Sequence, residues 1–101
     1  MNITIEKENN VTTAILEGRL DTLASQEVAS EMEKLNQAAD GTVVLDCKDL
    51  TYISSSGLRL FLSLRKAAVS KGGNIIIRNM SADIRQVFLM TGFLNLFQIE
   101  G

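Results

Sequence analysis

Residues 45–68, LDCKDLTYISSSGLRLFLSLRKAA, indicate the fold class because they join a strand pattern directly to a helix pattern. The run TVVLDC (42–47) is largely apolar, with Val43, Val44 and Leu45 in succession, which is typical of a strand covered on both faces. After the serines at 54–56, apolar residues recur at helical spacing from about Leu58 to Ser70. The following Lys71-Gly72-Gly73 ends this helix. We expect Asp46 and Asp49 to cap or turn a loop after the strand.

The rest of the chain alternates between the two patterns. The other predicted strands lie in NITIEKE and VTTAILEG, joined by a hairpin at Asn9-Asn10, in NIIIRN and, as a short strand, in FLNLFQIEG. One amphipathic helix is predicted over 22–39, with Leu23, Val28, Met32 and Leu35 inward. Another is predicted in ADIRQVFLMTG, between Ser81 and Gly92. The order β-β-α-β-α-β-α-β indicates an α/β fold, a mixed sheet of four to five strands with helices packed on it.

Two polar turns fall where strands of such a sheet end. They are GRLDT after the second strand and YISSSGL before the second helix. Ligands of open α/β sheets bind outside the carboxyl ends of the strands. We therefore expect both turns to lie at the same end of the sheet and to form one surface.

The composition limits the classes of function. The 101 residues fit one domain, 1–101, and the net charge of −2 gives no footprint for nucleic acid. No apolar run approaches the roughly 20 residues needed to span a membrane. Met1 leads straight into a strand pattern with no secretory signal, so we expect a cytoplasmic protein without membrane insertion.

Catalysis has no support in the residues. The chain has no histidine, so a serine nucleophile lacks its usual base, and the Gly-x-Ser-x-Gly elbow is absent. The single cysteine, Cys47, is expected to be a small buried residue, and the chain has no second thiol that could complete a metal site. We expect no enzyme activity, no catalytic residues, no metal and no cofactor.

The serine turn has a structural interpretation of its own. Ser54 is placed to cap the second helix, with Ile53 and Leu58 as a hydrophobic staple. Gly57 then leaves the neighbouring hydroxyls open to a partner, and Ser55 lies at the positive end of the helix. The serines could serve only as a polar helix start, and Asp21 only as the cap of the first helix. The residues expected in the core are Leu60, Phe61, Leu64, Phe88, Leu89 and Met90.

The segments EGRLDTLAS, VVLDCKDLTYISSSGLRLFLSLRKAAVSKGGNIII and VFLMTGF resemble the STAS domain, most closely the small single-domain bacterial anti-sigma factor antagonists. The resemblance covers nearly the whole chain. It implies a module that binds an anti-sigma factor, itself a serine kinase, and is released by phosphorylation. A serine phosphatase is a further implied partner, and we expect a monomer.

Aligned on Gly57, the family's phosphorylated serine matches Ser55, with Ser56 as the alternative. The chain departs from the family at Ser54, where antagonists have an aspartate. The residues expected to face the partner are Asp21, Thr22, Ser54, Ser55, Ser56, Gly57 and Arg59. Two other functions stay open, a constitutive scaffold subunit of a lipid or anion transport complex and a nucleotide-responsive module.

Overall fold

The computed structural model describes residues 1–101 and confirms the predicted order of elements. The strands are β1 (Asn2–Glu8), β2 (Val11–Leu20), β3 (Thr42–Ile53), β4 (Asn74–Arg78) and β5 (Gln98–Glu100). The helices are α1 (Thr22–Glu27), α2 (Ala29–Gln37), α3 (Ser55–Lys71) and α4 (Ala82–Thr91), followed by a 3-10 turn, η1 (Phe93–Leu96). None of the helices is both long enough and apolar enough to cross a membrane.

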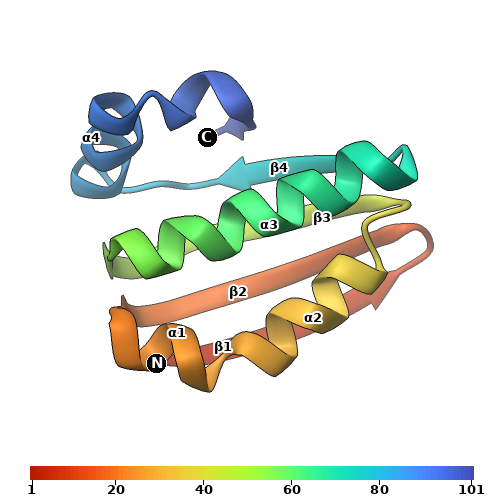
Figure 1. The fold of residues 1–101 in the computed structure, drawn as a ribbon, viewed down its shortest axis with the longest axis horizontal. Coiled ribbons are helices and arrows are strands. Elements are labelled where there is room, and N and C mark those ends of the chain that lie inside the picture. The colour runs from red at the N-terminus through yellow and green to blue at the C-terminus, as the bar shows by residue number, and fades with distance from the viewer.

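The five strands form one mixed sheet in the order β1-β2-β3-β4-β5. The hairpin makes β1 antiparallel to β2, and the other neighbouring strands are parallel because a helical connection returns the chain to the same end each time. Helices α1, α2 and α3 lie across one face of the sheet, and α4 lies beyond the end of β4 (Figure 1). The expected α/β fold, a mixed sheet with helices packed on it, is confirmed.

The helical segment after β2 differs from the prediction of one helix over residues 22–39. It is broken at Val28, whose backbone (φ −95°, ψ 5°) ends α1 and begins α2. Leu23 is 66 % exposed, and Ala24 and Ser25 are buried in its place. The reason is spacing, since Leu23 precedes Val28 by five residues, which is roughly 140° away around a helix. Met32 and Leu35 are buried as predicted.

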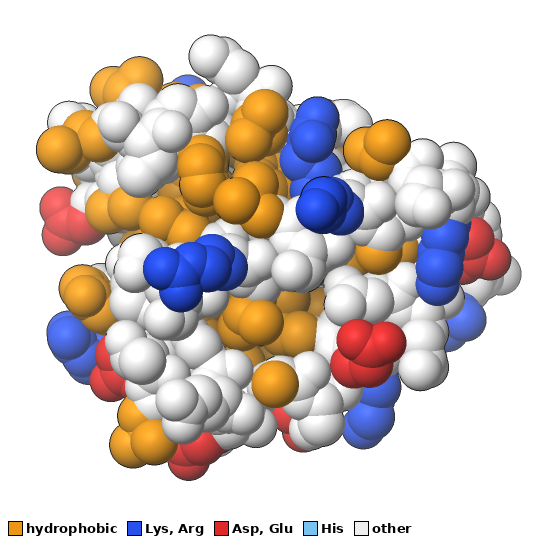
Figure 2. All heavy atoms as spheres, viewed as in Figure 1, with side chains coloured by type: hydrophobic (Ala, Val, Ile, Leu, Met, Phe, Trp, Pro, Cys, Tyr) orange, Lys and Arg blue, Asp and Glu red, His pale blue; other side chains and the backbone are white.

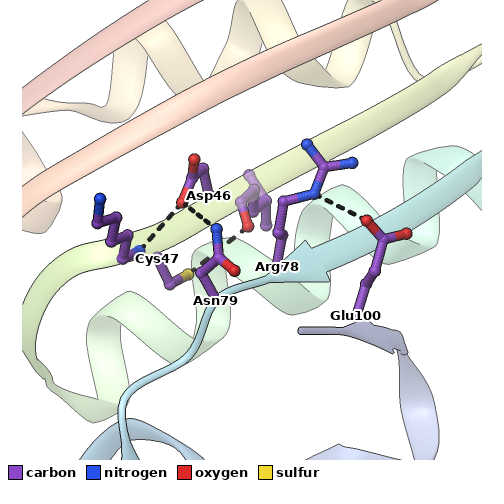
Figure 3. Close-up of polar contacts among 7 residues, drawn as sticks. Asp46, Cys47, Arg78, Asn79 and Glu100 are labelled. Carbon is purple, nitrogen blue, oxygen red and sulfur yellow. Dashed lines mark hydrogen bonds and ion pairs between the residues drawn. The ribbon is translucent and has the colours of Figure 1, made fainter.

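The strand β3 is longer than predicted and continues to Ile53. Asp46 and Asp49 therefore lie within the strand, and the expected loop after residue 47 is wrong. Pairing with β2, which includes two register shifts, keeps this polar stretch extended. Asp46 Oδ1 accepts hydrogen bonds from the backbone N–H of Lys48 (3.1 Å) and from Asn79 Nδ2 (3.4 Å), as Figure 3 shows.

The final strand is shorter than its apolar segment suggested and pairs in parallel with β4. Two further contacts join it to the end of β4. Arg78 Nε donates to Glu100 Oε1 at 2.9 Å, and the backbone N–H of Asn79 donates to the carbonyl of Glu100 at 3.0 Å (Figure 3). The Arg78–Glu100 contact is the one ion pair in the structure. Together the contacts hold β5 as the fifth strand of the sheet.

The core lies between the sheet and the helices. Phe61, Leu64 and Phe88 are buried as predicted, and Phe61 and Phe88 pack with ring centroids 5.9 Å apart. Leu60 is half-buried. Leu89 and Met90, predicted in the core, are 59 % and 77 % exposed. The short α4 reaches the core through its buried residues Ile84 and Phe88, which are one turn apart, so the two residues after Phe88 turn away from it.

Gly57 is buried where α3 crosses the ends of β2 and β3. An added Cβ would lie 2.8 Å from Leu20 Cγ and 3.0 Å from Ile53 Cγ1. The expectation that Gly57 opens the serines to a partner is therefore wrong, because this residue faces the core. Its lack of a side chain allows α3 to lie close against the sheet.

We predict that Gly57→Ala lowers stability. Overpacking costs about 1–3 kcal/mol, which exceeds the gain of up to about 1 kcal/mol in helix propensity. Ser63→Ala, at an exposed position of α3, is the matched control and should change stability by no more than about 0.5 kcal/mol. Urea denaturation measures both, and a Gly57→Ala protein as stable as the control would contradict the packing.

Cys47 makes stability sensitive to alkaline pH. Burial and, to a smaller extent, Asp46 raise the pKa of its thiol from 9.0 to about 12. The unfolded chain therefore releases the proton first, so the stability of the neutral buried thiol is complete below pH 9.0 and is lost as pH rises toward about 12. The loss at about pH 10 should be about 1.4 kcal/mol. Cys47→Ala should show less decline than the wild type, and parallel curves would contradict this assignment.

Candidate partner-binding site

The carboxyl ends of β2 and β3 place the two polar turns side by side. Leu20 pairs with Ile53 in the parallel register, and the backbone N–H of Ser54 donates to the carbonyl of Leu20 at 2.9 Å. Asp21 and Ser54, the residues that follow this pair, are thus neighbours. Both α1 and α3 begin at this end of the sheet, on the left in Figure 1.

Asp21 caps the first helix. Its Oδ1 accepts a hydrogen bond from the backbone N–H of Ala24 (2.8 Å), and its carbonyl accepts one from Ser25 Oγ (2.8 Å). The side chain is half-buried, so part of the carboxylate faces solvent. Thr22, the first residue of α1, is exposed. Asp21 therefore has a structural role in addition to any contact with a partner.

Ser54 caps α3, as predicted. Its Oγ accepts a hydrogen bond from the backbone N–H of Gly57 (3.1 Å), and its backbone is extended (φ −88°, ψ 171°). Ile53 and Leu58, the expected staple positions, are both buried. A serine hydroxyl caps about as well as a carboxylate, so the helix begins here without the negative charge that an aspartate would add.

The next two serines differ in accessibility. Ser55, the first residue of α3, is exposed, whereas Ser56 is half-buried. Arg59 is exposed one turn further along the helix, and residues four apart on a helix lie on the same face. Of the three hydroxyls, that of Ser55 is the most open to another protein, and it has a cation beside it.

The structure thus brings together Asp21, Ser54 and Ser55 at one end of the sheet, with Arg59 one turn along α3. Gly57 lies beneath this surface. Sequence reasoning missed a further pair at the same strand ends, Arg19 and Tyr52, whose guanidinium carbon lies 4.3 Å from the ring centroid. The two residues are register partners and precede Leu20 and Ile53, so they point to the opposite face of the sheet.

The side chains at this surface are suited to binding another protein. Its hydroxyls, carboxylate and guanidinium can contact another protein, and Ser55 can accept a phosphoryl group. The chain has no group of three or more His, Cys, Asp or Glu side chains placed to hold a metal ion. Cys47 is buried with a raised pKa, so its thiolate is not available as a nucleophile.

Comparison with known proteins places the chain in a family. The model of the STAS domain matches residues 2–101. A STAS-domain containing protein of Pseudomonas aeruginosa is 30 % identical (87 % of this chain, 86 % of the relative), and the anti-sigma-B factor antagonist of Bacillus subtilis is 25 % identical (99 % and 91 %). The unphosphorylated anti-sigma factor antagonist SpoIIAA has a TM-score of 0.74 at 21 % identity, covering 97 % and 86 % of the two chains. The phosphorylated form of Bacillus SpoIIAA also scores 0.74, at 23 % identity and 97 % and 90 % coverage. The chain belongs to the STAS domain family and is related to anti-sigma factor antagonists.

Proposed function

We propose that the chain is an anti-sigma factor antagonist that binds an anti-sigma factor with serine kinase activity and is released when Ser55 is phosphorylated. The observation that carries the proposal is the exposed Ser55 hydroxyl at the start of α3, beside the Ser54 cap and next to Asp21. The relative in Bacillus subtilis is an anti-sigma-B factor antagonist, and Bacillus SpoIIAA has a phosphorylated form.

The surface suits a protein partner. Asp21 and the serines at 54–56 line none of the surface hollows, and of these residues Ser55 is the exposed one. The chain supplies only a positioned nucleophile. In the transfer step Ser55 Oγ forms a bond to the γ-phosphorus of ATP, the bond to ADP breaks, and the hydroxyl proton passes to a base of the kinase.

The phosphate should act on binding and leave the fold intact. At the N-terminus of its own helix it gains roughly 0.3–1 kcal/mol, too little to rearrange α3. In an interface, a charge of about −1.5 to −2 that the partner cannot pair costs several kcal/mol. The difference between these magnitudes makes Ser55 a switch of affinity.

A second function, the constitutive scaffold of a transport complex, is favoured by one observation. Ser54 stands where the resemblance to antagonists implies an aspartate, so a kinase that requires this charge would not modify Ser55. Such a scaffold would use the same surface without a switch.

We predict that Ser55→Ala stays bound to the anti-sigma factor whatever the ATP level and that Ser55→Asp binds weakly. Incubation with ATP and the kinase from the same genome, followed by tandem mass spectrometry, should locate the phosphate on Ser55. Ser56→Ala is the control and should still be phosphorylated. Phosphate on Ser56 alone would move the site by one residue, and none on any of the three serines would favour the scaffold.

We predict that Asp21→Asn separates the charge of Asp21 from its role as a cap. Asparagine caps as well as aspartate, so the melting temperature should change little while partner affinity falls. Asp21→Ala should lose about 1 kcal/mol of stability as well. Calorimetric titration with the anti-sigma factor measures the affinity. Unchanged binding by Asp21→Asn would mean that Asp21 acts only as a helix cap.

A further inference from the structure

The outward face of α3 carries side chains at the spacing of a coiled-coil seam. The α3 seam consists of Ser55, Arg59, Leu62, Lys66 and Val69. The intervals alternate between four and three residues, which is the spacing of positions that face a partner helix. Val69 is 68 % exposed, and Leu62 is half-buried. Figure 1 shows α3 crossing the front of the molecule with its outward face uncovered.

The middle of the seam contains a shallow hollow between side chains of successive helical turns. Arg59, Leu62, Ser63 and Lys66, with Arg65 beside them, line a shallow hollow of about 430 Å³. Four residues at positions i, i+3, i+4 and i+7 form the hole that receives one knob of a packed helix. Leu62 is the apolar residue of this hollow, and the long cationic side chains form its walls.

The charge of α3 differs in sign from that of the chain. The helix carries Arg59, Arg65, Lys66 and Lys71 and no acidic residue, while the chain has a net charge of −2. Arg65 Nε and Lys71 Nζ donate to the backbone carbonyls of Leu96 (2.7 Å) and Asn36 (3.0 Å). Arg59 and Lys66 form no ion pair, because the one ion pair in the structure joins Arg78 to Glu100. Figure 2 shows basic side chains following the line of α3 on this face.

We infer that the α3 seam is the docking site for an amphipathic, acidic helix of the partner protein. Its apolar side chains would pack on Leu62 and Val69, and its carboxylates would face Arg59 and Lys66. The inference rests on the proposed function in one respect, that this helix belongs to the anti-sigma factor. A second copy of the chain fits poorly, because paired seams would bring like charges together. A nucleic acid would not use the exposed Val69.

The seam also explains how a phosphate on Ser55 would weaken the complex. Ser55 is the first residue of the seam and lies one helical turn before Arg59. A phosphoryl group there would pair with Arg59 within the same helix and repel the carboxylates of the docked helix. Phosphorylation would therefore remove one cation from the seam and add an opposing charge at its end.

The test uses the full chain, labelled with ¹⁵N, and a synthetic helical peptide of three heptads with leucine and glutamate at its seam positions. We expect saturable shifts of backbone amides along residues 55–69. Lys66→Glu should weaken binding at least about tenfold, while Arg85→Glu, the same charge change on α4, should stay within about twofold. A peptide with lysine in place of glutamate should not bind. Equal binding to Lys66→Glu and wild type, or saturable shifts confined to other elements, would overturn the inference.

Two additions keep the outcomes distinct. Val69→Asp changes an exposed apolar position and should weaken the peptide complex as well, so the test does not depend on one variant folding. Displacement of the peptide by an equal concentration of a poly(U) oligonucleotide would assign the surface to nucleic acid and overturn the inference.

The same variants, titrated with the purified anti-sigma factor, separate this inference from the proposed function. Suppose that the factor binds and phosphorylates Ser55, and that Lys66→Glu weakens neither the peptide complex nor the complex with the factor. The α3 seam is then not the docking site, and the proposed function stands. If the peptide depends on Lys66 while no anti-sigma factor binds, the seam stands and the function is wrong.

Discussion

The parallel pairing of β2 with β3 is the constraint on which the candidate site depends. Leu20 and Ile53 are register partners and both are buried, so Asp21 and Ser54 follow them from neighbouring positions. The same two apolar side chains form the surface on which Gly57 lies. The site is thus fixed by backbone hydrogen bonds and apolar contacts beneath it, while the Ser55 side chain remains exposed above it.

The two caps show why structural and functional roles overlap at this end of the sheet. Asp21 and Ser54 each satisfy an N–H group that the start of a helix leaves without a partner. The caps hold the first turns rigid, which fixes the position of Ser55. A serine at the start of α3 provides this geometry without the negative charge that an aspartate cap would add.

One face of α3 packs against the core, and the opposite face is exposed at the surface. Its inner residues, among them Phe61, Leu64 and Ala68, are buried against the sheet, and its outer residues form the α3 seam. Packing on one side holds the helix in place, so the side chains on the other side keep a fixed spacing. A partner that docks there meets a surface already arranged for binding, which lowers the entropy lost on association.

The order of elements, the start of α3 and the caps Asp21 and Ser54 could be predicted from the sequence, because turn residues and apolar periodicity act over a few neighbouring positions. Features that depend on contacts between distant segments became visible in the three-dimensional structure alone. Pairing with β2 extends β3 past Asp49, the break at Val28 sets which side chains of α1 are buried, and the contact with Leu20 turns Gly57 inward. Leu89 and Met90 are exposed because α4 meets the core on one narrow face. Each of these outcomes depends on which surface lies opposite, and local pattern does not contain that information.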